Sequence, residues 1–272
     1  DVRVKSLSSL LARPVREYTH MSAVGIEWIN TVTGQLVPQR ALLLGLAVGL
    51  PLVLTLLRWG HTQFKGVKWW AIVVLGMITS LLLVIHVHTF IVMAVVGFVL
   101  LVIHPKQWRQ WLLYCFSTVI PALLLYAWLY SGQLGQHFMQ WYPGWMANPH
   151  AHNMNVLGFW LLNWGLFLPL AIVGTVTNKL YKQPVVIIGF VIFVLSNVVL
   201  FQPYNWDNSK LFIWSYLFLC VPVAATLGQL WHTKYVGKIV VAVLFFALTA
   251  SGFLDLWHIT RTKHVSALEW RS

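Results

Sequence analysis

Asp207 has the clearest chemical potential in this sequence, because it is the only acidic residue between positions 28 and 254. A carboxylate at the edge of a lipid bilayer is costly, so it generally has a partner or a function. In one interpretation Asp207 caps a helix that begins near Asn208 and pairs with Lys210. In the other, Asp207 binds a hydroxyl or a divalent cation, while Lys210 or Arg40 binds a phosphate. The sequence leaves both interpretations open.

Two pairs of histidines have the spacing His-x-His: His86 with His88, and His150 with His152. Two such imidazoles converge in an extended segment but diverge by roughly 200° in a helix. A structural zinc site usually takes four ligands, often cysteine, and neither pair has a cysteine nearby. We therefore assign no metal ligands and leave a divalent cofactor open. We expect neutral imidazoles that either hydrogen-bond within a polar outer cleft or bind a sugar or a phosphate, with His88 as a catalytic candidate beside Asp207.

The residues that could contact a substrate lie in four segments with few charges but several titratable or amide side chains. These segments are 37–40, 85–89, 148–153 and 201–210. Beside Asp207 and His88, the candidate substrate or phosphate ligands are Arg40, Lys210, Gln39, His86 and Asn208. Whether these side chains can act together depends on the elements that lie between them.

The composition indicates that those elements are membrane helices. Hydrophobic residues make up 59% of the 272 residues and charged residues only 9%, whereas a soluble domain has about 25% charged residues. This composition argues against a soluble enzyme and against a disordered chain. The formal net charge is +12, but the basic residues are scattered between apolar runs, so we expect no nucleic-acid partner. The predicted fold is an all-α, polytopic transmembrane bundle in contact with membrane lipid.

Apolar runs that approach the roughly 20 residues needed for a membrane helix occur eight times. They are 41–58, 69–86, 88–103, 111–131, 156–177, 184–201, 211–231 and 238–258. The second and third runs follow each other almost without a loop, which is typical of a tight helical hairpin or of a tilted or partly re-entrant segment. We therefore predict a bundle over 41–258, between segments 1–40 and 259–272.

The basic residues between these runs predict an orientation in the membrane. Every second connection is basic, and together these connections hold Arg58, Lys65, Lys68, Lys106, Arg109, Lys179, Lys182, Lys234 and Lys238. The alternate connections hold only Lys210. Because Lys and Arg collect on the cytoplasmic side, we expect the four candidate segments, 1–40 and 259–272 to be extracytoplasmic. The basic residues of 1–40 run against this rule, which long translocated segments tolerate.

Two further observations limit the possible functions. They are the polar residues inside the predicted spans and the absence of several known motifs. The amides of Asn163 and Asn197 need partners in lipid, so we expect both to hydrogen-bond between helices. The sequence contains no P-loop, dinucleotide-binding glycine motif, HExxH zinc motif or GxSxG nucleophile motif. It also has no paired carboxylates, which argues against a two-acid hydrolase.

Four stretches resemble a family of large polytopic membrane proteins of bacteria and fungi, which is similar in organisation to the C-type (GT-C) glycosyltransferases. They are Leu36–Arg40, His86–Phe90, Phe159–Phe167 and Phe201–Lys210. The similarity covers most of 30–260. The string Gln-Pro-aromatic-x-Trp-Asp-Asn-x-Lys, which begins at Gln202, is the stretch most specific to the family.

This resemblance implies a glycosyltransferase that takes sugar from a lipid-phosphate donor, such as a polyprenyl-phosphate sugar, at the extracytoplasmic face. It implies a bacterial inner-membrane protein of which this chain is the later part. The catalytic base of C-type enzymes is an Asp or Glu after the first span, which would lie upstream of Asp1, and neither Glu17 nor Glu27 stands in that motif. Two other interpretations stay open: a transporter or lipid-binding module, and a scaffold without chemistry.

Overall fold

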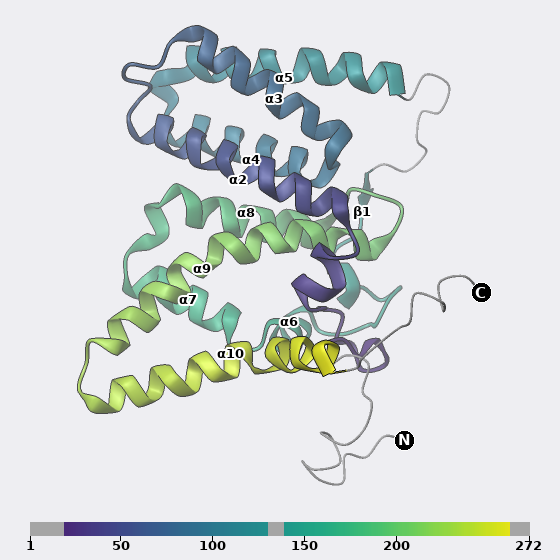
Figure 1. The fold of residues 1–272 in the computed structure, drawn as a ribbon, viewed down its shortest axis with the longest axis vertical. Coiled ribbons are helices and arrows are strands. Elements are labelled where there is room, and N and C mark those ends of the chain that lie inside the picture. The colour runs from purple at the N-terminus through teal and green to yellow at the C-terminus, as the bar shows by residue number, and fades with distance from the viewer. Residues whose placement is uncertain (1–18, 130–138, 262–272) are drawn as a thin grey trace.

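The computed structural model describes residues 19–129 and 139–261. The predicted terminal segments 1–40 and 259–272 therefore lie partly outside the described residues. The described chain is almost entirely helical, which confirms the all-α fold (Figure 1). Its α-helices are α2 (Arg40–His61), α3 (Trp69–Ile85), α4 (Val87–Ile103), α5 (Trp108–Leu129), α6 (Val156–Trp164), α7 (Phe167–Thr177), α8 (Pro184–Val198), α9 (Ser209–Trp231) and α10 (Tyr235–Arg261).

Short elements connect these helices. The segments of 3-10 helix are Ser22–Val24, Pro105–Gln107, Trp145–Ala147, Leu180–Lys182 and Asn205–Asn208, and Thr31–Leu36 forms a π-helix. Two short strands, β1 (Gln140–Trp141) and β2 (Val199–Leu200), pair antiparallel. Gln140 lies opposite Leu200 in this register. The pairing joins two connections that are far apart in the sequence.

Each of the eight predicted apolar runs contains a helix, but fewer than eight of these helices are long enough to cross a bilayer alone. In the described chain four helical segments meet the length and hydropathy of a span: Arg40–His61, Pro105–Leu129, Asn205–Trp231 and Tyr235–Trp257. α6 and α7 would form a fifth as one span, although they are bent by 97° at their break. α3, α4 and α8 are apolar but have 17, 17 and 15 residues.

Backbone conformation explains why some of these helices are short. α3 ends at His86, whose φ of −162° and ψ of 98° are extended. α8 ends at Val199, which is also extended and begins β2. The long run 156–177 is broken at Gly165, whose φ is +52°, a region that favours glycine. Hydropathy alone does not reveal such breaks.

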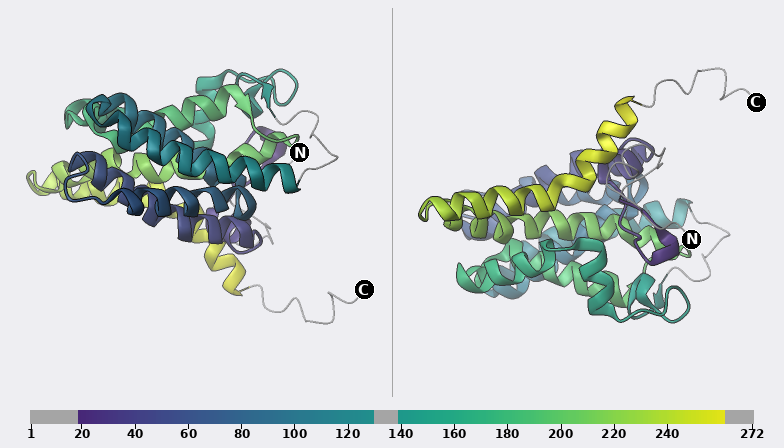
Figure 2. Two further views of the ribbon diagram at one scale, coloured as in Figure 1. Left: turned by 90° about the horizontal axis from the view of Figure 1, so that it is seen from above. Right: turned by 90° about the horizontal axis from the view of Figure 1, so that it is seen from below.

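The helices stack side by side as a slab. α3 packs mainly on α5, α2 on α4, α4 on α8, and α9 on α8 and α7 (Figures 1 and 2). α10 packs mainly on α9 and lies at the edge of the slab. Glycine permits one of these close approaches, because a Cβ added to Gly174 of α7 would lie 2.2 Å from the carbonyl oxygen of Pro222 in α9.

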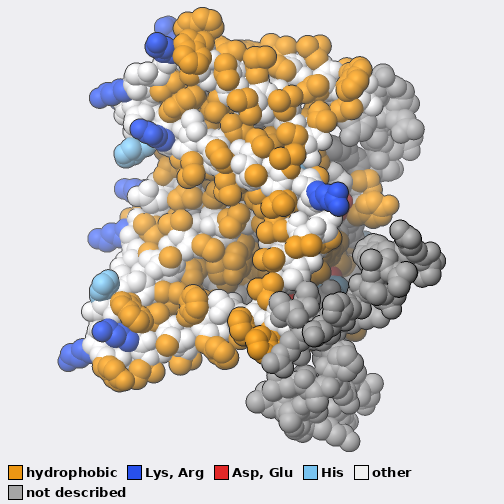
Figure 3. Space-filling model, in the orientation of Figure 1, with side chains coloured by type: hydrophobic (Ala, Val, Ile, Leu, Met, Phe, Trp, Pro, Cys, Tyr) orange, Lys and Arg blue, Asp and Glu red, His pale blue; other side chains and the backbone are white. Residues whose placement is uncertain are grey.

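Apolar side chains cover the sides of the slab as well as its interior. One buried cluster is centred on α2, α4 and α9, and a second gathers Trp145, Trp160 and Phe212 between α6 and α9. Outside these clusters, large apolar side chains such as Leu124 and Phe246 are exposed by 69% and 72%. Figure 3 shows this apolar surface across the middle of the molecule. Such extensive apolar exposure is expected of a surface that faces lipid.

Charge is divided between the two ends of the slab. The connections α2–α3, α4–α5, α7–α8 and α9–α10 lie at one end, and Lys and Arg side chains gather along that edge (Figure 3). We call this edge the basic end. The α3–α4 turn, residues 139–155 and residues 199–208 lie at the opposite end, which we call the polar end. The connections that were predicted to be on the same side of the membrane therefore lie at the same end of the bundle.

Candidate functional site

Residues 139–155 and 199–208 are tied together at the polar end. Beyond the β1–β2 pair, Nε1 of Trp145 donates to the carbonyl oxygen of Asn205 at 2.6 Å. Nδ2 of Asn205 donates to the hydroxyl of Tyr142 at 3.1 Å. Trp145 is fully buried. Two of the four segments predicted to carry function are thus held in one place.

Glu27 joins the N-terminal segment to this assembly. Its side chain is only 3% exposed, and its Oε1 lies 2.6 Å from Nε2 of His152. The same oxygen accepts a hydrogen bond from the Ser22 hydroxyl at 2.5 Å, and Oε2 lies 3.4 Å from Nε2 of His20. Nε1 of Trp206 donates to the Glu27 carbonyl at 3.3 Å. Among the described residues, this carboxylate is paired with imidazole and hydroxyl groups rather than with Lys or Arg.

Asn163 of α6 holds the backbone beside this carboxylate. Its Oδ1 accepts from the amide nitrogens of Glu27 and Trp28 at 2.7 and 2.8 Å. Its Nδ2 donates to the carbonyl oxygens of Gly25 and Phe159, both at 2.9 Å. Asn163 therefore has the hydrogen-bond partners that were predicted, but they lie in the N-terminal segment and in α6 itself rather than in another helix. Asn197 does bond to another helix, since its Oδ1 accepts from Nε1 of Trp160 at 2.8 Å.

The electrostatic state of Glu27 follows from two opposing effects. Burial alone would raise the pKa of the Glu27 carboxyl, because it disfavours the charged form. The hydrogen bonds from Ser22, His152 and His20 favour the charged form and leave the pKa below its usual value. Glu27 is therefore ionised at neutral pH and provides a fixed negative charge at the polar end.

Asp207 and Lys210 form an ion pair. Nζ of Lys210 lies 2.8 Å from Oδ1 of Asp207, and the two side chains are 15% and 20% exposed. The predicted pairing is confirmed, but the helix cap is not, because α9 begins after Asn208 and its first turn has no side-chain cap. This pair places one anion and one cation side by side, both within reach of solvent.

The other residues predicted to bind phosphate differ from one another in burial. Asn208 is fully buried; its Nδ2 donates to the carbonyl oxygens of Ser196 and Val199, and its Oδ1 accepts from the amide of Phe201. These bonds attach the start of α9 to the end of α8 and β2. Gln39 is half-buried just before α2, and Arg40, the first residue of α2, is exposed. Arg40 is therefore the more accessible phosphate ligand.

His86 and His88 lie inside the bundle at the α3–α4 turn. Nδ1 of His86 accepts from the amide of Thr89 at 3.3 Å and so caps α4. His88 is 2% exposed, and the centres of the two imidazole rings are 5.2 Å apart. Neither Nε2 has a hydrogen-bond partner. Both residues thus contribute buried polar atoms to the α3–α4 turn.

Metal binding finds no support in the part of the chain that the structure describes. No group of three or more His, Cys, Asp or Glu side chains is arranged to hold an ion there. The imidazoles of His20 and His152 approach the Glu27 carboxylate as hydrogen-bond partners instead. A divalent cofactor would need ligands beyond those that these residues offer.

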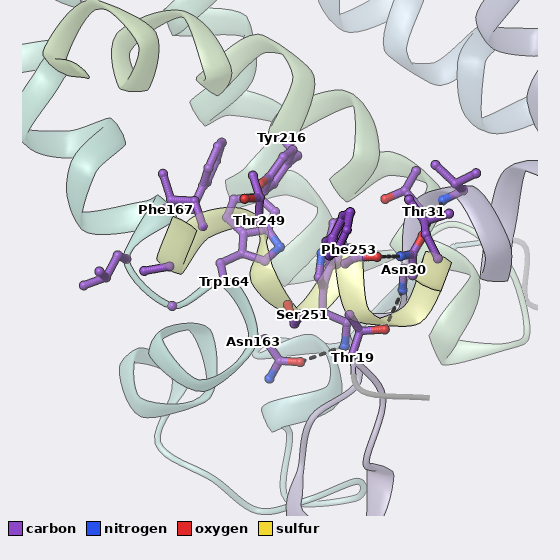
Figure 4. Close-up of a pocket in the computed structure, with 18 of the residues that line it drawn as sticks. Thr19, Asn30, Thr31, Asn163, Trp164, Phe167, Tyr216, Thr249, Ser251 and Phe253 are labelled. Atoms are coloured by element: carbon purple, nitrogen blue, oxygen red, sulfur yellow. Dashed lines mark hydrogen bonds between the residues drawn. The ribbon is translucent and has the colours of Figure 1, made fainter. Parts of the chain in front are cut away.

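A cavity of about 560 Å³ lies where α6 and α7 break. It is lined by the break, by α9 and α10, and by residues of the N-terminal segment, and it is partly open to the surroundings. Trp28, Trp164 and Tyr216 contribute aromatic walls, and Figure 4 shows Trp164 near the centre of the group. Nδ2 of Asn30 donates to the carbonyl oxygen of Gly252 at 3.0 Å, which attaches α10 to the cavity wall. This cavity adjoins the Glu27 cluster through Trp28 and Asn163.

Comparison of the chain with protein-family models, with curated proteins and with solved structures found no match. The assignment of function therefore depends on the residues themselves. Sequence reasoning did not select Glu27 or pair it with His152, although it noted the His150–His152 segment. The one available signal was the scarcity of carboxylates: Glu27, Asp207 and Asp255 are the acidic residues of the described chain.

Proposed function

We propose that this protein is a multi-pass integral membrane protein with eight membrane-crossing segments, including the broken pair α6–α7. The short helices are compatible with this count. A helix of 17 residues extends about 25 Å, which is only slightly less than the thickness of a hydrocarbon core, about 30 Å. Extended residues such as His86 and Val199 add to their reach. The basic end then faces the cytoplasm and the polar end faces outward, as in a bacterial inner-membrane protein.

The proposed activity is transfer of a sugar from a lipid-phosphate donor at the polar end, in the manner of a C-type glycosyltransferase. The observation that carries it is the Asp207–Lys210 pair, which is partly exposed in the stretch that most resembles the family. Lys210 and the exposed Arg40 would bind the donor phosphate, because a cation at the membrane surface suits a phosphate oxygen. Asp207 would orient the hydroxyl of the acceptor.

The remaining predicted residues hold the backbone around this site in place. His86 and Asn208 hold the α3–α4 turn and the start of α9, and Gln39 precedes Arg40 at the start of α2. His88, buried behind them, would act on the substrate only through the position of its neighbours. In this proposal the described residues bind and position the substrates.

The test is sugar transfer in membranes that contain the complete protein. Radiolabelled polyprenyl-phosphate sugar is supplied, and transfer to lipid or protein acceptors is measured. Lys210→Ala and Asp207→Ala should abolish transfer, whereas Lys65→Ala, which removes an exposed cation at the basic end, should leave it unchanged. Wild-type transfer by both polar-end variants at normal expression would refute the assignment.

A transporter is the second candidate, and the broken pair α6–α7 favours it. Discontinuous helices that meet at a cavity are typical of substrate sites in secondary transporters. The 97° bend and the 560 Å³ cavity occur at the same place in this chain. Solute uptake into proteoliposomes that stops when the membrane potential is removed would favour transport, while transfer without uptake would favour the enzyme.

A further inference from the structure

In the part of the chain that the structure describes, the residues that line the cavity at the α6–α7 break carry no formal charge. None of them is Asp, Glu, Lys, Arg or His, and the nearest described carboxylate is that of Asp255, which accepts from the Thr19 hydroxyl behind the wall. A phosphate or a carboxylate enclosed there would lack a counter-charge, and burying an unpaired charge is strongly unfavourable. The chemistry of the walls therefore selects an uncharged ligand and places the donor phosphate elsewhere.

Aromatic rings form one part of this cavity. Tyr216 stacks on Phe167 with ring centres 3.8 Å apart, and Trp28 stacks on Tyr216 at 5.8 Å. Trp164 meets Trp28 edge to face at 5.5 Å. These mutual contacts hold the rings rigidly in the cavity wall, so a ring-shaped ligand that packs against their remaining surface costs them little conformational freedom.

Hydrogen-bonding groups form the other part. The Thr249 hydroxyl already donates to the carbonyl oxygen of Phe245 at 2.8 Å, and the Thr19 hydroxyl donates to Asp255 and accepts from the amide of Asn30. Oδ1 of Asn30 already accepts from two backbone amides. The hydroxyls of Ser251 and Tyr216 also line the cavity and can each donate and accept. A ligand with hydroxyls of its own can bond to them, whereas a hydrocarbon ring cannot.

Trp164 adds an indole donor to this wall. Its side chain is 5% exposed, and its Nε1 is buried without a hydrogen-bond partner among the described residues, although the residue lines the cavity. A buried donor left unpaired is costly, so native structures usually provide an acceptor for it. Figure 4 shows the Trp164 ring among the other lining residues. An oxygen of a bound ligand would complete this bond once the side chains that cover Nε1 shift to admit it.

We propose that the cavity at the α6–α7 break is the acceptor site of the protein and binds an uncharged carbohydrate headgroup. The combination of aromatic faces, oxygen acceptors and one indole donor, without charge, matches a sugar ring and its hydroxyls. The assignment as an acceptor site rests on the proposed transferase function. The binding of the carbohydrate does not, and it can be measured alone.

The experiment is photolabelling of the full chain in lipid nanodiscs with an octyl glucoside that carries a diazirine. Labelled peptides are identified by mass spectrometry, and unlabelled octyl glucoside or octyl phosphocholine is added as competitor. We expect labelling of 156–167 and of α10 that glucoside reduces and phosphocholine does not. Equal competition by both amphiphiles would overturn the proposal, because it would indicate a nonspecific apolar surface.

Two variants test the role of Trp164. Trp164→Phe keeps an aromatic ring but removes the donor, and should raise the apparent Kd for the glucoside about fivefold. Trp214→Phe is the matched control, because Nε1 of Trp214 is equally buried and unpartnered but Trp214 does not line the cavity. Unchanged affinity in the folded Trp164→Phe variant would overturn the proposal.

A third variant tests the proposal if Trp164→Phe does not fold. Thr249→Trp fills the cavity from an exposed position on α10 and should abolish the specific labelling. Persistent labelling in this variant would also contradict the proposal. Specific glucoside binding in a protein that transfers no sugar would leave the carbohydrate site standing and refute the enzyme. Sugar transfer without specific labelling would support the enzyme and refute the carbohydrate site in this cavity.

Discussion

Nε2 of His152 lies 2.6 Å from Oε1 of Glu27, although 125 positions separate the two residues. This contact connects the N-terminal segment to the connection between α5 and α6. Glu27 is almost completely buried, whereas His152 is partly exposed. A carboxylate–imidazole pair therefore links these two segments at the polar end, beside the broken span α6–α7.

The first prediction concerns the pH dependence of stability. The pKa of Glu27 is below its usual value in the folded protein, so its ionised form stabilises the fold above the unfolded pKa of about 4.3. That contribution is lost as the pH falls from this value through the folded pKa. Thermal unfolding of wild type in detergent should shift to lower temperature in this acidic range, and Glu27→Gln should shift less. Parallel curves for the two proteins would contradict the assignment.

The second prediction concerns Asn163, whose side chain makes four hydrogen bonds to backbone groups. Asn163→Ala leaves two buried amide donors without their acceptor, and each unpaired group costs about 1–3 kcal/mol. We expect a clear fall in unfolding temperature, measured by fluorescence-detected thermal scanning. Asn178→Ala is the control, since Asn178 bonds only to Gly174 and Thr177 of its own helix. An equal effect of the two variants would count against the role of Asn163.

The third prediction concerns the contact between α7 and α9. Gly174→Val places side-chain atoms where Pro222 and Thr226 already stand, and such overpacking costs about 1–3 kcal/mol. The variant should elute as a broader species in size-exclusion chromatography and unfold at lower temperature. Gly228→Val is the matched control in α9, because a Cβ there meets no atom within 4 Å. Normal behaviour of Gly174→Val would show that the helices are less closely packed.

The fourth prediction concerns orientation in the membrane. In a variant with Cys115→Ser and Cys220→Ala, a single cysteine is introduced as His150→Cys at the polar end or Lys65→Cys at the basic end. Both positions are exposed. A membrane-impermeant maleimide should label His150→Cys in intact spheroplasts and Lys65→Cys only after lysis. Labelling of Lys65→Cys in intact spheroplasts would reverse the proposed orientation.

The amino-acid sequence is sufficient to predict which parts of the chain are apolar helices and which connections are basic. Both properties are local, because a helix satisfies its own backbone hydrogen bonds and hydropathy is a sum over neighbouring residues. The pairing of Asp207 with Lys210 was predictable for the same reason, since only three positions separate them. The shortening of α3 at His86 and the break at Gly165 were not predictable from hydropathy, because single backbone torsions produce them.

Which of the polar residues come together depends on the packing of segments that are distant in the sequence. Glu27 meets His152 and Asn163 because β1 pairs with β2 and α6 turns away from α7, and no local pattern records contacts across more than 100 positions. The same packing buries His88, which its place near an apolar run had made a catalytic candidate. It also creates the cavity beside Trp164, since residues from four distant segments form its walls.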